Sequence, residues 1–284
     1  MKLITWNIQW GRGADGRVDL DRIVEQARAI ADFDVLCLQE VADGFDDLPG
    51  SPTGNEFAEL ARRLPGYDAI EGVAIDLPAR EGATRRRFGN MILSRLPVGA
   101  VFRHLLPWVQ DSAEMSMQRV ALEATLATPL GPLRVTTTHL EYYSPTQRMA
   151  QVERLIELHR EALSHARTPR AGGPGDGPFT VSPRGAQAVL VGDLNFRPDT
   201  PEHTRLVAGS DTATTRYLDA WELSHPGQPH DPTVGLHDKA QWPDEPFTFD
   251  FALVSEDLAG RVREVRVDAR SDGSDHQPML IEIL

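Results

Sequence analysis

The sequence predicts an α/β protein in which two packed sheets are covered by helices. Short apolar runs of strand length alternate with longer segments whose apolar residues recur at helical spacing. Strand-rich halves interleaved with helices are typical of two sheets that pack against each other. At 284 residues the chain is short enough for one connected core, so we expect a single domain over residues 1–284.

The first half of the chain supplies most of the expected strands. The segment 19–31 predicts a helix because Leu20, Ile23, Val24 and Ala27 fall on one face. The β-branched residues of 135–138 suit a pleated strand. The full set is a strand at 3–8, helices at 19–31 and 55–64, and strands at 34–39, 68–73, 88–94, 98–105, 119–127 and 133–140.

The second half begins with the longest expected helix, at 145–166, where Gln147, Arg148 and Glu153 are expected to face solvent. Residues 167–185 are dense in Gly and Pro and predict a flexible surface loop inside the domain. The strand pattern resumes after this loop, which argues against a linker between domains. The remaining strands are expected at 188–192, 249–254, 262–267 and 278–283.

Charge and composition restrict the partners. Lys and Arg number 29 and Asp and Glu number 42, giving a formal charge of −13. Such a chain repels long polyanions unless its basic residues are concentrated locally, which lowers the expectation of DNA processing without excluding it. The one cysteine, Cys37, lies in an apolar run and is expected to be a buried, inert thiol. Without a signal-peptide pattern or an apolar run of membrane-spanning length, the expected location is the cytoplasm.

Polar residues able to bind metal or phosphate recur at the ends of the apolar runs. Asn7 follows the run 3–6, Glu40 follows 35–39, and His139 follows 135–138. Ligands of open α/β sheets gather at one end of the strands, so we expect these side chains to converge. Taken singly, each has an ordinary structural explanation, such as a turn or a solvated strand end. Further polar residues in or directly beside such runs are Asn90, Asp193, Asn195, Asp250, Asp275 and His276.

Together these motifs resemble the endonuclease/exonuclease/phosphatase superfamily of DNase I-like phosphoesterases, over residues 2–284. The resemblance implies a four-layer α/β/β/α sandwich with two central mixed sheets, and metal-dependent hydrolysis of phosphate esters. All branches share these motifs, so they do not choose among nucleases, sphingomyelinases and inositol polyphosphate phosphatases. The segments concerned are Trp6-Asn7-Ile8-Gln9, Leu38-Gln39-Glu40, Gly89-Asn90, Thr138-His139-Leu140, Gly192-Asp193-Leu194-Asn195, Asp250 and Ser274-Asp275-His276.

The resemblance also implies a cofactor, Mg²⁺ or Mn²⁺. Glu40 matches the principal metal carboxylate, and Asn7 and Asp275 match positions that join or support the metal shell. Oxygen donors of this kind are those that a hard cation prefers.

The remaining motif residues are implied to perform the chemistry. Asp193 matches the residue that orients or deprotonates the attacking water, and Asn195 is placed to hold developing charge. His139 and His276 match histidines that donate to phosphate oxygens. Asp250 matches the carboxylate that orients His276 and favours its imidazolium form.

Three further features bear on phosphate binding. Asn90 either contacts phosphate or supports the cluster, and Arg119 either adds positive charge near phosphate or forms an ordinary surface ion pair. The run 85–87, three arginines, either attracts the substrate or is a solvated loop. Aromatic residues that could line the mouth of the site are Trp10, Trp108, Tyr142, Tyr143, Phe196 and Trp242.

Three functional hypotheses follow. The charge of −13 favours a phosphodiesterase or phosphatase acting on a small molecule or a lipid headgroup. The alternative is an endonuclease or exonuclease acting on DNA or RNA, which predicts binding that weakens steeply with salt. The third is a binding module with an inactive site, against which the full set of catalytic-type residues argues. The expected partner is the phosphate-ester substrate, and the sequence implies no protein partner.

Overall fold

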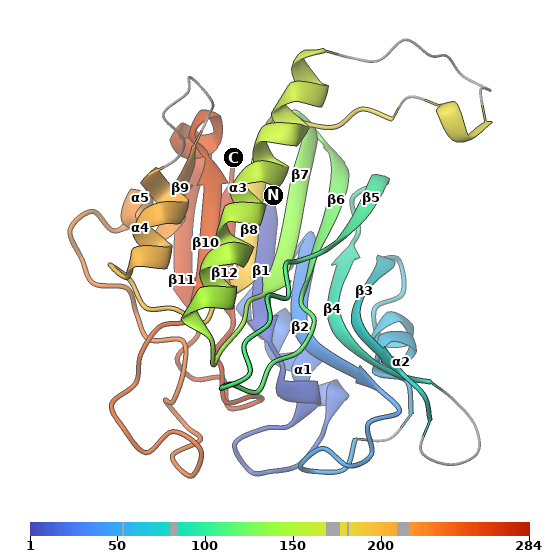
Figure 1. Cartoon of the computed structure of the whole chain (residues 1–284), viewed down its shortest axis with the longest axis vertical. Helices are drawn as coiled ribbons and strands as arrows, with labels where there is room; N and C mark the ends of the chain where they lie inside the picture. The colour runs from blue at the N-terminus through green and yellow to red at the C-terminus, as the bar shows by residue number, and fades with distance from the viewer. Residues whose placement is uncertain (53, 80–84, 169–176, 181, 209–215) are drawn as a thin grey trace.

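The computed structural model describes residues 1–52, 54–79, 85–168, 177–180, 182–208 and 216–284. Within these residues the strands form two six-stranded sheets (Figure 1). The first has the order β11-β12-β1-β2-β4-β3 and the second β5-β6-β7-β8-β10-β9. The first sheet contains β1 (Lys2–Asn7), β2 (Val35–Asp43), β3 (Asp68–Leu77), β4 (Arg86–Ser94), β11 (Val262–Val267) and β12 (Met279–Ile283). The second contains β5 (Val98–Leu105), β6 (Val120–Thr128), β7 (Gly131–His139), β8 (Ala188–Asp193), β9 (Tyr217–Asp219) and β10 (Asp250–Ser255).

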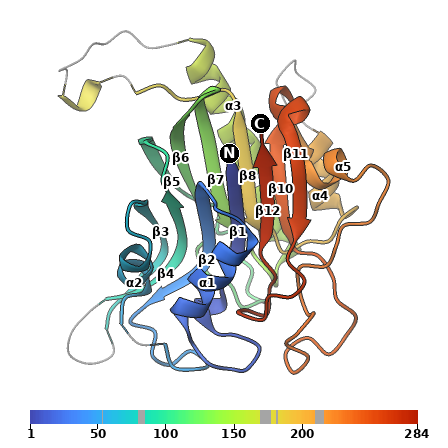
Figure 2. The same cartoon turned by 180° about the vertical axis from the view of Figure 1, so that it is seen from behind.

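Each sheet is mixed in the same way. β1 and β2 run parallel, β7 and β8 run parallel, and the other named pairs are antiparallel. The helices are α1 (Leu20–Ile30), α2 (Glu56–Arg63), α3 (Pro145–Arg167), α4 (Pro201–Ala208) and α5 (Ala220–Ser224), with 3-10 turns η1 (Gln9–Gly11), η2 (Gly177–Phe179) and η3 (Glu256–Arg261). α3 lies in front of the sheets in Figure 1 and behind them in Figure 2, on the side opposite α1.

Three apolar clusters lie between the layers. Side chains such as Leu3 and Val135 meet between the two sheets. Ile23 and Phe57 of α1 and α2 pack on the outer face of the first sheet. Leu155 of α3 packs with residues of α4 on the outer face of the second. Because both faces of each sheet are covered, the central strands are apolar on both faces. The predicted four-layer α/β/β/α sandwich is confirmed.

Local signals explain where the helices begin. The side chain of Asp19 accepts the backbone N–H groups of two residues in the first turn of α1, and Asn55 caps α2. Ser144 caps α3 and is followed by Pro145 at its first position, where a missing N–H costs nothing. None of the helices in the described segments is long and apolar enough to cross a bilayer.

Two polar residues near the start of α3 are not exposed as expected. Gln147 is fully buried, and Arg148 donates to the backbone carbonyls of Glu141 and Tyr142 and pairs with Glu202, so the prediction that they face solvent is wrong. Arg148 thereby holds the loop after β7, and the side chain of Gln147 donates to the hydroxyl of Ser116 at 3.2 Å, which explains why these polar side chains are buried.

The Gly- and Pro-rich segment expected at 167–185 can be judged in part. Its residues 169–176 and 181 lie outside the described ranges. Near its end, buried Arg184 donates to Glu123 at 2.9 Å and to Glu161 at 3.1 Å, and its guanidinium lies 4.5 Å from the ring centre of Phe102. The chain is therefore attached to the second sheet before β8 begins.

Candidate active site

Both parallel strand pairs end on the same side of the sandwich, away from the chain termini (Figure 1). Asn7 at the end of β1 is opposite Gln39 of β2, and His139 of β7 is opposite Asp193 of β8. A hydrogen bond of 3.0 Å from Asn7 Nδ2 to Asp193 Oδ2 joins the two sheets at this end. The register of four central strands thus brings distant polar residues together.

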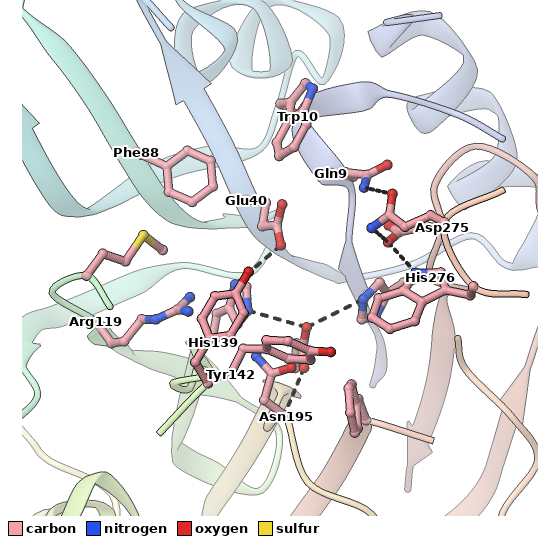
Figure 3. A pocket seen from close by; sticks show the side chains of 16 residues that line it. Gln9, Trp10, Glu40, Phe88, Arg119, His139, Tyr142, Asn195, Asp275 and His276 are labelled. Carbon is pink, nitrogen blue, oxygen red and sulfur yellow. Dashed lines mark hydrogen bonds and ion pairs between the residues drawn. The ribbon is translucent and has the colours of Figure 1, made fainter. Parts of the chain in front are cut away.

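A cavity of about 470 Å³ opens at this end, within the size range of small-molecule sites. Most of the predicted site residues line it (Figure 3). These are Glu40, Arg119, His139, Asp193, Asn195, Asp275 and His276. Asn7, Asn90 and Asp250 are buried behind the lining.

Asp193 is the centre of the polar network. Its Oδ2 accepts the hydrogen bond from Asn7, and the Nε2 atoms of His139 and His276 lie 3.4 and 3.6 Å from the same oxygen. Its Oδ1 accepts the backbone N–H of Asn195 at 3.0 Å. Burial raises the pKa of Asp193 to about 7, against the opposing charge of His276. A carboxyl group with a pKa near neutrality is suited to accept a proton at physiological pH.

His276 is held by Asp250. Its Nδ1 lies 2.8 Å from Asp250 Oδ2, which also accepts the hydroxyl of Thr233 at 2.7 Å. Burial alone lowers the pKa of His276, but the neighbouring carboxylates, above all that of Asp250, raise it well above its ordinary value. His276 is therefore an imidazolium whose Nε2 faces Asp193 and the cavity.

His139 has the opposite electrostatic character. Burial and the charges of Arg119 and His276 lower its pKa well below the ordinary value, so the ring is neutral at pH 7. Its Nδ1 lies 3.7 Å from Glu40 Oε1 and has no hydrogen-bond partner among the described residues. The cavity thus contains one charged and one neutral imidazole, each able to donate an N–H.

The carboxylates of Glu40 and Asp275 are the candidate cation donors. Burial and the charge of Asp275 raise the pKa of Glu40, against the hydrogen bond from Asn7 and the charges of His276 and Arg119. Ligand atoms of Glu40, His139 and Asp193 lie within 4.8 Å of one another. Oxygen donors with one imidazole suit Mg²⁺ or Mn²⁺, so the residues present fit a divalent cation.

Asn7 supports the carboxylates of Glu40 and Asp193. Its amide nitrogen donates to Glu40 Oε1 at 2.9 Å as well as to Asp193, while its Oδ1 accepts the backbone N–H of Gln9 at 3.0 Å. Of the two predicted alternatives, joining the metal shell or supporting it, the hydrogen bonds favour support.

Asp275 is positioned by Gln241 and Trp242, of which the sequence analysis placed Trp242 at the mouth of the site but did not predict the contact with Asp275. The side-chain N–H groups of Gln241 and Trp242 both donate to Asp275 Oδ2, each at 2.9 Å. Gln9 donates to Gln241 Oε1 at 2.8 Å, so the turn after β1 supports the loop that carries Gln241 (Figure 3). Gln residues in irregular segments carry no sequence signal for such a contact.

Arg119 reaches the cavity from the residue before β6. Its buried guanidinium lies 3.5 Å from Glu141, and its Nη1 has no hydrogen-bond partner within the described residues. Burial lowers its pKa, and Glu141 acts against that effect. Asn90 lies behind Arg119 and donates to the carbonyl of Val120 at 2.9 Å, which supports the strand instead of contacting the cavity. Of the two alternatives for Arg119, its burial argues against an ordinary surface ion pair.

Of the other residues predicted to meet the substrate, some lie outside the cavity and some line it. Arg85, Arg86 and Arg87 pair with Asp76, Asp47 and Asp43 respectively, so their charges are offset outside the cavity. Among the aromatic residues expected at the mouth, Phe196 is a core residue and exposed Trp108 does not line the cavity. Those that line it are Trp10, Tyr142, Tyr143 and Trp242, joined by Phe88 and Phe249, which were not predicted.

The backbone around the cavity is strained. Gln9, Trp10, Glu40 and Asn195 have φ values of 45°, 46°, 60° and 52°, in the left-handed region that non-glycine residues rarely adopt. Such outliers persist where the surrounding structure fixes them, and they concentrate at functional sites. Gly192, with φ of 137°, directly precedes Asp193, and a Cβ there would lie 1.9 Å from the carbonyl oxygen of Thr138.

Two mixed sheets faced by helices, with carboxylates and histidines at the ends of the central strands, define a DNase I-like α/β sandwich. A family model described as the Endonuclease/Exonuclease/phosphatase family matches residues 4–276, and the chain belongs to this family. Members of the family are hydrolases that act on phosphoesters and generally depend on divalent metals. No protein with a curated description matches the chain.

Solved structures agree with this assignment. An endonuclease/exonuclease/phosphatase from Beutenbergia cavernae is 28% identical with a TM-score of 0.68, covering 100% of this chain and 71% of that one. The mannosyl-6-phosphatase of Bacteroides thetaiotaomicron is 17% identical with a TM-score of 0.67, over 100% and 99%. The human nocturnin catalytic domain, with bound sulfate, is 19% identical with a TM-score of 0.65, over 100% and 93%.

Proposed function

We propose that the protein is a Mg²⁺- or Mn²⁺-dependent hydrolase of phosphate esters, acting on a small molecule or a lipid headgroup in preference to nucleic acid. The observation that supports it most is the convergence of Glu40, His139, Asp193 and His276 on one cavity. The binding-module alternative is not favoured, because every implied catalytic residue is present and most of them line one cavity.

Glu40 and Asp275 would hold the cation, with Asn7 and Gln241 fixing their carboxylates. When bound, the cation supplies polarisation of the phosphoryl oxygens and offsets charge on the leaving oxygen. Its positive charge would also act against the burial and the repulsion by Asp275 that raise the pKa of Glu40.

The protein residues supply water activation and charge stabilisation. Asp193 orients a water molecule and accepts its proton as the water oxygen bonds to phosphorus. The ester P–O bond breaks, and the proton returns to the leaving oxygen or to solvent. The imidazolium of His276 and the neutral N–H of His139 donate to phosphoryl oxygens, and the unpartnered N–H group of Arg119 neutralises a further oxygen.

The preference against nucleic acid rests on charge. The chain carries a formal charge of −13, and the arginines 85–87 at the start of β4 are paired with aspartates. A polynucleotide track needs a series of free cationic side chains.

A substrate panel with Mg²⁺, Mn²⁺ or EDTA tests the proposal: p-nitrophenyl phosphate, bis-p-nitrophenyl phosphate, sphingomyelin, inositol phosphates, plasmid and single-stranded oligonucleotide. We expect metal-dependent turnover of small esters that Asp193→Ala and His276→Ala both abolish. Faster turnover of plasmid or oligonucleotide would establish the nuclease alternative. Silence across the panel from folded, metal-binding protein would leave the binding module.

A further inference from the structure

The cavity has two unlike regions. Its floor is the polar network of Asp193 and the two histidines, whereas its walls are aromatic. The ring centroids of Tyr142 and Trp242 lie 6.3 Å apart, and those of Tyr142 and Phe249 lie 6.1 Å apart, both with interplanar angles of 71°. In Figure 3, Trp10 and Phe88 lie on the opposite side of Glu40 from Tyr142. Aromatic side chains therefore line the cavity on both sides of Glu40.

Cationic groups are scarce in the cavity. Among the described lining residues, Arg119 is the one Lys or Arg side chain, and His276 is the one imidazolium. The three arginines of 85–87 are paired with Asp43, Asp47 and Asp76 elsewhere. The lining carboxylates and one bound phosphoryl group are all negative, and together they would already take up the positive charge of a bound cation, Arg119 and His276. A second phosphoryl group would meet aromatic walls and no free positive charge.

Trp242 belongs to both regions. Its ring lines the cavity and packs edge-on against Tyr142, while its Nε1 donates to Asp275 Oδ2 at 2.9 Å. The loop that carries it is anchored, because Asp238 accepts the backbone N–H of Gln241 and pairs with Arg12 at 3.3 Å. A group that packs on this ring therefore contacts the residue that fixes a candidate metal carboxylate.

We propose that the cavity selects an ester with a single phosphoryl group whose other part presents a flat or ring-shaped apolar face, and that Trp242 is its specificity and positioning residue. This inference rests on the proposed function and narrows its substrate class. The ring of Trp242 binds the face of the substrate, and its N–H holds Asp275. Sugars, nucleosides and aryl groups each present such a face, and the substrate set below distinguishes phosphate esters of these three classes.

Matched substrates test the first part. Phosphate release is measured with Mg²⁺ for adenosine 5′-monophosphate, adenosine 3′,5′-bisphosphate, glucose 6-phosphate, p-nitrophenyl phosphate and glycerol 3-phosphate. The first pair differs by one phosphoryl group on the same rings, and glycerol 3-phosphate lacks a ring. We expect kcat/KM for adenosine 5′-monophosphate or glucose 6-phosphate, which are alkyl esters like glycerol 3-phosphate, to exceed that for glycerol 3-phosphate by roughly 10-fold to 100-fold, the range of one aromatic stacking contact. The bisphosphate should be worse than its monophosphate.

Variants of Trp242 test the second part. Trp242→Phe retains an aromatic face but loses the N–H, so kcat should fall by roughly 10-fold with little change in KM. Trp242→Ala should in addition raise KM for the ring-bearing substrates and remove their advantage over glycerol 3-phosphate. Trp108→Ala, at an exposed tryptophan outside the cavity, is the matched control and should change neither constant. Circular dichroism and thermal melting establish that each variant is folded.

The outcomes are distinct. A bisphosphate turned over as well as its monophosphate, equal turnover of glycerol 3-phosphate, or a folded Trp242→Ala that matches Trp108→Ala would each overturn the inference while leaving phosphate-ester hydrolysis intact. If none of these substrates releases phosphate while bis-p-nitrophenyl phosphate or sphingomyelin is cleaved with Mg²⁺, the inference fails and the proposed function stands. Absence of metal-dependent turnover of these diesters as well would overturn both.

Discussion

The pairing of Asp250 with His276 gives the sharpest mutational prediction. Asp250→Asn keeps the size of the side chain and removes the charge that contributes most to raising the pKa of His276. Asp250 Oδ2 accepts hydrogen bonds from both His276 and Thr233. If the asparagine turns its amide nitrogen toward His276 Nδ1, its carbonyl turns away and the hydrogen bond from Thr233 is lost. Without the negative charge the ring loses its imidazolium character, and a neutral ring that keeps its proton on Nδ1 cannot donate from Nε2.

The magnitude follows from what His276 supplies. Loss of one preoriented charged donor to a developing negative charge lowers kcat by roughly 10²-fold to 10³-fold. Asp250 does not line the cavity, so KM should change by less than about threefold. The expected result at pH 7 is therefore a large fall in kcat at nearly constant KM. The kcat of His276→Ala sets the lower limit for that of Asp250→Asn.

The pH dependence gives a second readout. Without Asp250 the pKa of His276 falls, so the imidazolium forms only at lower pH. The ratio of variant to wild-type kcat should rise as pH is lowered from 8 to 5.5, with steady-state kinetics on p-nitrophenyl phosphate as the assay. A folded Asp250→Asn with kcat within about threefold of wild type at pH 7, or a ratio that does not depend on pH, would refute the reasoning.

Three further predictions concern stability and binding. Burial raises the pKa of Glu56 from 4.5 to about 8 in the folded state, so folded protein binds the extra proton between these values and stability falls as pH rises through that window. Glu56→Gln should thus be more stable than wild type at pH 9, by about 2–4 kcal/mol, and match it near pH 4.5 in chemical denaturation; parallel profiles would contradict this. Arg119→Ala should lower kcat/KM roughly 10-fold to 100-fold, mainly through KM; an unchanged KM would remove Arg119 from phosphate binding. Gly192→Ala should cost more than about 3 kcal/mol, because its Cβ meets strand β7, whereas Gly16→Ala, with φ of 79° and open space, should cost about 1 kcal/mol in the same urea titration; equal losses would contradict the contact.

Much of the site could be predicted because its residues belong to strands. Asn7, His139 and Asp193 end apolar strands whose order and register place them together. The position of a residue at the end of a buried strand is a local property that the sequence shows directly. The same holds for Asp250 at the start of β10, which binds His276 in the segment just before β12.

The contacts made by loops were not predictable in the same way. Gln241 and Trp242 reach Asp275 because the ion pair of Arg12 with Asp238 fixes their loop, and that pair joins residues 226 positions apart. Arg148 has the sequence context of a solvated helix residue, yet its guanidinium donates hydrogen bonds to backbone carbonyls of the preceding loop. Short elements such as α4 and α5 were also missed, because five to eight residues carry little periodicity.

The most direct test of the central claim is phosphate release from p-nitrophenyl phosphate by EDTA-treated protein as Mg²⁺ or Mn²⁺ is added back, for wild type and Glu40→Gln. Glu40→Gln retains an acceptor for Asn7 while it removes the charge that faces the cation. We predict saturable restoration of turnover in wild type and a metal requirement at least tenfold higher, with a lower maximum, in Glu40→Gln. Turnover that survives EDTA, or identical metal titrations for the two proteins, would contradict a cation held at Glu40.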